Sequence, residues 1–212
     1  MLAYHFVGNT LRDGSPVPAD GVVLKMDGPI YLCERGFHAS LHPFDALQYA
    51  PGNVLCLVEM GGTIKHGTDK LVASERTIIK RVNAEQMLRK FACDMALSVA
   101  HLWDIPAAVK NYLTTQNETE ADAAYAASYA ACDAVYAAAE AAACDAAHAA
   151  CDAVYAAAGA AAGVAAYAAY AASYAVYAAA GLRPGCALRA GVAAREKQKQ
   201  DFLMRVEKLF SL

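Results

Sequence analysis

A histidine and an aromatic residue stand side by side where the sequence could most readily do chemistry. His38 follows Phe37 at the expected end of a strand. There an imidazole and a ring could stack on a nucleobase or form a hydrogen bond with it. The alternative is a histidine whose ring nitrogens are satisfied by the backbone of a turn. His5 is open to the same two interpretations, and for both residues the structural role is the simpler one.

Other familiar kinds of site lack their sequence patterns. Seven cysteines and six histidines occur without metal-ligand spacing, so we expect neither a metal site nor a bound cofactor. Gly61 and Gly62 form a turn, but no helix with a Lys-Ser or Lys-Thr pair follows, as a phosphate loop would require. The cysteine number is odd and the first residues do not resemble a secretion signal. We therefore expect a cytoplasmic protein with reduced thiols.

Alanine dominates the second half of the chain. The segment 121–180 has 35 alanines and eight tyrosines, and contains no Leu, Ile, Met, Phe or Trp. A near-repeat, Asp-Ala-(Ala/Val)-(Tyr/His)-Ala-Ala, begins at residues 122, 133, 145 and 152. Alanine is the strongest helix former. We expect helices that break near 141–144 and 159–163 and fold back into antiparallel hairpins.

Two classes of partner are disfavoured by the charge pattern. Residues 153–182 are uncharged, but alanine drives membrane insertion only weakly, so we expect no membrane span. The formal net charge is −3, and no long basic run occurs. Duplex nucleic acid is therefore not an expected partner.

The elements that must position these residues follow from hydrophobic periodicity. Residues 1–82 predict a β-rich domain, with strands near 4–7, 22–25, 30–33, 53–60, 71–73 and 77–79. Residues 83–212 predict a helical domain that begins with a large-residue amphipathic helix and ends with a basic one. We expect the apolar face of the last helix to dock on the 87–103 helix. The predicted fold is α+β: a small β-rich N-terminal domain followed by an alanine-rich antiparallel helical bundle.

Two family resemblances add to this interpretation. The 71–76 run, the 87–93 helix, the alanine tract and the 198–212 helix resemble an uncharacterised family of bacteria and their phages, whose alanine-rich half is called immunity-protein-like. This resemblance implies a role in bacterium–phage conflict, and it implies no particular enzymatic activity.

The second resemblance lies in the N-terminal part. The run 35–40 followed by 45–50 is similar to the ADP-ribosyltransferase pattern, in which a Gly-aromatic strand end precedes an Ala-x-x-Tyr-Ala helix. In that fold three side chains, an early His or Arg, a Tyr or Ser, and a late Glu, surround a nicotinamide dinucleotide (NAD). The positions that match this pattern are His5, Ser40, Tyr49 and Glu75. Arg76 is next to Glu75 and could neutralise its carboxylate, and it is a further ligand-binding candidate.

The leading hypothesis is a non-enzymatic binding protein of immunity or counter-defence. Its N-terminal domain would hold a nucleotide-like molecule or a protein partner at residues drawn from the six candidates His5, His38, Ser40, Tyr49, Glu75 and Arg76. The first alternative is an ADP-ribosyltransferase-like enzyme using NAD. The second is a structural protein that forms homo-oligomers through its alanine face.

Overall fold

The computed structural model divides the chain into two compact units. The first comprises Met1–Ala84 together with Phe202–Leu212, and the second comprises Glu85–Asp201. The structure describes residues 1–102, 104–117 and 187–211, together with residues 120–121, 123–124, 127, 145, 148–150, 152–154, 167–168, 170–172, 174–175 and 178.

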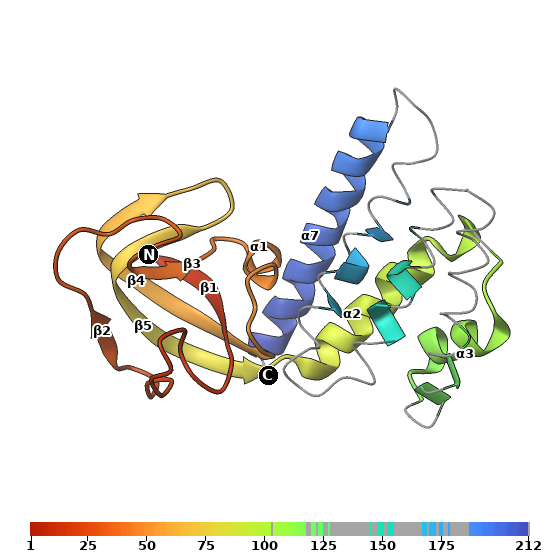
Figure 1. Cartoon of the computed structure of the whole chain (residues 1–212), viewed down its shortest axis with the longest axis horizontal. Coiled ribbons are helices and arrows are strands. Elements are labelled where there is room, and N and C mark those ends of the chain that lie inside the picture. The colour runs from red at the N-terminus through yellow and green to blue at the C-terminus, as the bar shows by residue number, and fades with distance from the viewer. Residues whose placement is uncertain are drawn as a thin grey trace. The chain divides into compact units, whose positions relative to one another are not determined.

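An antiparallel sheet of five strands forms the first unit (Figure 1). The strands are β1 (Leu2–Val7), β2 (Val23–Lys25), β3 (Phe37–Ala39), β4 (Val54–His66) and β5 (Leu71–Asn83). β4 and β5 form a long hairpin, with β1 paired to the free edge of β4. β2 and β3 both pair with β5, at successive positions along its other edge.

The sheet closes on itself just beyond β3. Ser40 and Tyr4 exchange both backbone hydrogen bonds, with N–O distances of 2.8 and 2.9 Å. The order β1–β4–β5–β3 therefore returns to β1, and the strands enclose an apolar interior. Side chains from four strands line this interior, among them Ala3, Val7, Ala39, Cys56, Val58, Met60, Leu71, Ala73 and Ile78.

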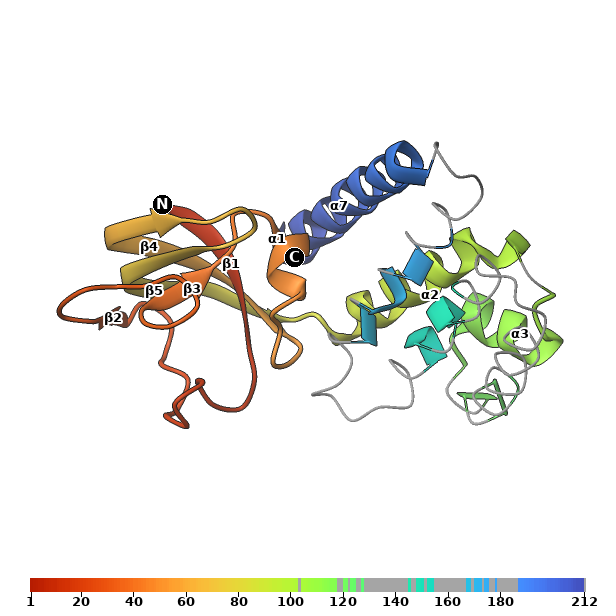
Figure 2. The ribbon, with the colours of Figure 1, turned by 45° about the horizontal axis from the view of Figure 1, so that its top comes forward.

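Two helices cover the outer side of the sheet. They are α1 (Pro43–Leu47) and the C-terminal end of α7 (Ala187–Ser211), which lie side by side in Figures 1 and 2. The ring of Phe202 meets that of Phe44 edge-on at 5.9 Å, and Phe210 lies 6.5 Å from Tyr4. The Lys80 ammonium donates a hydrogen bond of 2.6 Å to the backbone oxygen of Phe210. The end of the last helix thus packs against α1 and the strands, whereas we expected its apolar face to dock on the 87–103 helix.

The second unit begins with three helical elements. They are α2 (Glu85–Ser98), the short 3-10 helix η1 (Ala100–Leu102) and α3 (Ala107–Thr115). The amphipathic face expected for the first of these is confirmed, because Leu88, Phe91, Met95 and Val99 are buried. Further along, Gln198 of α7 donates a hydrogen bond of 3.1 Å to the backbone oxygen of Ala172.

The fold is α+β, but the expected β-rich N-terminal domain followed by an antiparallel helical bundle is wrong. The helical residues that the structure describes do not form a clear bundle. The predicted breaks at 141–144 and 159–163, and most of each alanine repeat, lie outside the described residues. The sheet unit also extends beyond the N-terminal part of the sequence, because Phe202 and Val206 are fully buried and belong to the same compact unit as the strands.

One predicted strand is also absent. Residues 30–33 form a tight turn, in which Tyr31 and Arg35 bond each other's backbone at 2.7 and 3.0 Å. Cys33 lies at its tip with a φ of 70°. The chain reverses there, so these apolar residues cannot extend into a strand.

Candidate functional site

The histidine singled out in the sequence is engaged with this turn. His38 Nε2 accepts a hydrogen bond of 2.9 Å from the backbone N–H of Cys33. Burial lowers the pKa of His38, and so do the nearby charges of Lys70, Arg12 and Arg76. The imidazole is therefore held by backbone, as the simpler interpretation expected, within a cationic neighbourhood.

Tyr49 lies in a small polar cluster at the surface. Its hydroxyl donates a hydrogen bond to the Asp69 carboxylate, and the Lys70 ammonium lies 4.1 Å from the ring centroid. The bond to Asp69 raises the pKa of Tyr49, because the carboxylate accepts from the protonated phenol. Tyr49 is 49% exposed, so its ring lies at the surface beside a cation.

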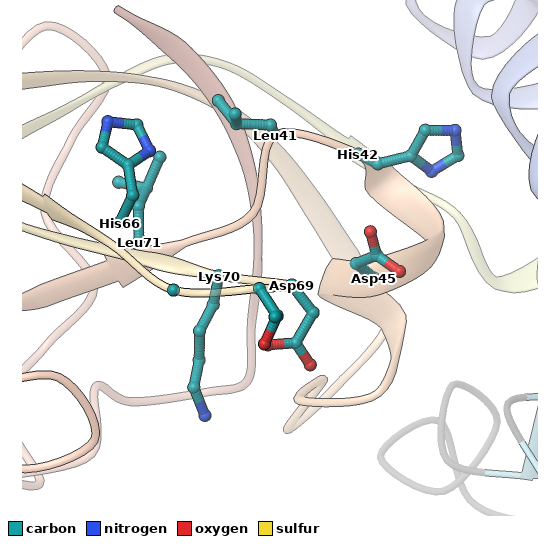
Figure 3. A pocket seen from close by; sticks show the side chains of 9 residues that line it. Leu41, His42, Asp45, His66, Asp69, Lys70 and Leu71 are labelled. Atoms are coloured by element: carbon teal, nitrogen blue, oxygen red, sulfur yellow. The ribbon is translucent and has the colours of Figure 1, made fainter.

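A shallow pocket adjoins this cluster. It lies between the start of α1 and the turn that joins β4 to β5, and has a volume of about 70 Å³. Figure 3 shows His42 and Asp45 on one side and His66 and Leu71 on the other. Pockets that hold whole small-molecule ligands typically measure about 300–1,000 Å³, so this pocket has room for a small polar group rather than a whole nucleotide.

The remaining candidates lie elsewhere on the sheet. Ser40 is 1% exposed, and its backbone joins β3 to β1. Glu75 forms an ion pair of 3.0 Å with Lys25. Arg76 is buried, and successive strand residues point to opposite faces, so Glu75 faces away from it.

His5 lies on the same side of the sheet as Arg76. Burial, and then the charges of Arg76 and His38, lower its pKa to about 3. The structure thus brings His5, His38 and Arg76 near one another, and it places Tyr49 with Lys70. It does not bring His5 and Glu75 together around one ligand.

Residues 1–90 match a family model described as a domain of unknown function, DUF7666. That match spans β1 to β5 and the first residues of α2, and so includes all six candidates. No curated protein and no solved structure matches the chain significantly.

Two kinds of feature are missing from the part of the chain that the structure describes. No helix there is long and apolar enough to cross a membrane. Within the same residues, no group of three or more His, Cys, Asp or Glu side chains is arranged to hold a metal ion.

The sequence interpretation missed the polar turn that supplies most of the pocket. His66 is the last residue of β4, and Asp69 and Lys70 lie in the turn between β4 and β5, two strands of 13 residues each. A turn with basic, acidic and imidazole groups at the tip of a long hairpin is a recognisable signal, since loops on a rigid scaffold often carry binding residues. The sequence predicts two short strands, near 71–73 and 77–79, where the structure has the single long strand β5 after this turn.

Proposed function

We propose that the protein is a non-enzymatic binding protein for a nucleotide-like ligand, acting in bacterium–phage conflict. The observation that carries the proposal is the exposed Tyr49 ring with Lys70 against it, beside a pocket for one polar group. An aromatic face supports base stacking, and a neighbouring lysine supports a phosphate. The resemblance to the bacterial and phage family supplies the biological setting.

The positions of His5 and Glu75 support binding over ADP-ribosyl transfer. Transfer would need both side chains around the nicotinamide ribose, whereas the Glu75 carboxylate is held by Lys25 on the face opposite Arg76. The proposal places the protein in the cytoplasm, in keeping with the free thiols of Cys33, Cys56 and Cys93. A protein partner in place of the nucleotide-like ligand is the second version of this proposal. In both versions the alanine-rich half would mediate self-association.

Calorimetry with a panel of mononucleotides, cyclic nucleotides and NAD tests the proposal. The variant Lys70→Met should weaken the binding of the tightest ligand about tenfold, which corresponds to about 1.4 kcal/mol. The matched control is Lys65→Met. Lys65 lies 5.1 Å from the ring of Tyr31, which is also 49% exposed, but its ammonium is bound to the Ile30 oxygen at 2.7 Å.

Three outcomes would change the assignment. Equal losses of nucleotide affinity in Lys70→Met and Lys65→Met would show that the ligand does not bind at Tyr49. Absence of binding to every nucleotide, with a host protein captured by the full chain, would favour the protein partner. Transfer of label from NAD that is lost in Glu75→Gln would establish the enzyme in place of this proposal.

A further inference from the structure

Arg76 is a cation buried inside the closed sheet. The residue is 5% exposed, whereas its neighbours in the strand, Glu75 and Thr77, are half-buried. Its Nη1 donates a hydrogen bond of 3.1 Å to the backbone oxygen of His38, and its guanidinium carbon lies 5.4 Å from the ring centroid of Phe37. Both contacts are to neutral groups.

No carboxylate balances this charge within the described residues. Glu75, its neighbour in sequence, is paired with Lys25. Arg81, on the same strand, shows the usual arrangement, with Nε 2.6 Å from an oxygen of Asp20. By contrast, Arg76 Nε is fully buried and makes no hydrogen bond to any residue that the structure describes.

Such an arrangement is costly unless something compensates for it. Removing a cation from water carries a large desolvation penalty, which a counter-charge normally offsets. Burial lowers the pKa of Arg76 to about 10, and the nearby Cys56 acts in the opposite direction. The guanidinium stays charged near neutral pH, so the interior holds a positive charge with an unused N–H donor.

The groups beside Arg76 suit an anion. His5 is neutral near pH 7, since its pKa is about 3, and a neutral imidazole retains one N–H donor. His5 and Phe37 are both half-buried, on the strands β1 and β3 that meet at the Tyr4–Ser40 bridge. Guanidinium groups bind phosphate and carboxylate through two parallel N–H donors.

We propose that Arg76, assisted by His5, binds the oxyanion group of a small ligand, a phosphate or a carboxylate, inside the closed sheet. The proposal does not depend on the nucleotide site at Tyr49. The side chain of His38 points to the Cys33 turn, whereas Arg76 approaches His38 from its backbone oxygen. An anion on Arg76 would supply the counter-charge that the described residues lack.

Thermal unfolding of the full chain tests this proposal with inorganic phosphate and with acetate as separate probes. Both are compared with chloride at equal ionic strength. We expect one or both probes to raise the melting temperature of the unaltered protein and of Lys70→Met. We expect no rise in Arg76→Met. The probe that acts identifies the oxyanion as phosphate or carboxylate.

Arg81→Met is the matched control. It removes an arginine from the same strand, but one already paired with Asp20, and should retain the anion-induced rise. In chloride alone, Arg76→Met should be at least as stable as the unaltered protein, because methionine removes a buried charge without a partner. If Arg76→Met does not fold, Arg76→Lys replaces it and should show a reduced rise, since an ammonium lacks the forked pair of donors.

Three results would overturn the proposal. The first is an equal rise in Arg76→Met and the unaltered protein, and the second is a rise that is lost only in Lys70→Met. The third is no rise in the unaltered protein together with a lower melting temperature of Arg76→Met in chloride, which would give Arg76 a structural role in holding Phe37 and His38. None of these results would change nucleotide binding, so the two proposals fail separately.

Discussion

Truncation of Phe202 should destabilise the strands that lie at the other end of the sequence. Phe202 is fully buried, and its ring meets Phe44 of α1 at 5.9 Å and 75°. Replacing a buried phenylalanine with alanine costs about 3–5 kcal/mol, from lost burial and the cavity left behind. For a domain of this size, each kcal/mol lowers the melting temperature by about 4–8 °C. We therefore expect Phe202→Ala to lower the transition of the sheet unit by at least about 12 °C.

Met204 provides the control on the same helix. It lies two residues further along and is 62% exposed, so Met204→Ala should change the stability by less than about 0.5 kcal/mol. Hydrogen exchange measured by mass spectrometry locates the effect. Peptides from β1 and β4 should lose protection in Phe202→Ala and keep it in Met204→Ala. Unchanged protection of these strands in Phe202→Ala would refute the conclusion that residues 202–212 complete the sheet unit.

Three other perturbations follow from local geometry and burial. Gly36→Ala should destabilise by more than Gly14→Ala in urea unfolding. Both glycines have positive φ, but a Cβ at Gly36 would lie 2.4 Å from Val72 Cγ2, whereas one at Gly14 would meet nothing within 4 Å. Equal losses of unfolding free energy in the two variants would contradict this prediction. Burial raises the pKa of Asp152 to about 7, so the folded state holds its proton more tightly than the unfolded state. The free energy of unfolding should therefore fall as the pH rises from about 4 to about 7, and Asp152→Asn should remove this fall. Because the pKa of His5 is about 3, its ring should remain neutral in an NMR titration down to about pH 5. The free energy of unfolding should therefore decrease as the pH falls from about 6.5 towards 3. A charged His5 ring at pH 5.5 would contradict the burial of this residue.

Several elements were predictable because their signals are local. The run at 53–60 predicted part of β4, and the spacing of Leu88, Phe91 and Met95 predicted the buried face of α2. The run at 30–33 failed because apolar composition alone does not separate a strand from a turn. The backbone hydrogen bonds between Tyr31 and Arg35 make that segment a turn.

The candidate site was predictable only in part. Tyr49 and His38 were singled out by type, but their partners Lys70 and Cys33 were not. These contacts join segments that are distant in sequence, and no periodicity describes them. The sequence predicts that Arg76 neutralises the carboxylate of Glu75. In the structure the two side chains lie on opposite faces of the strand, because successive strand residues alternate between faces, and Glu75 pairs with Lys25.

By itself, the sequence determined the contrast between a β-rich first part and an alanine-rich second part, and the amphipathic faces of the helices. Those properties follow from side-chain volume and period, which act within a few residues. Only the tertiary structure decided that Ser40 closes the sheet onto Tyr4 and that the end of α7 covers the outer side of the strands. An apolar helix face can pack against any apolar surface of suitable shape. The site that the end of α7 covers was therefore decided by tertiary packing, in which Phe202 fits beside Phe44 of α1.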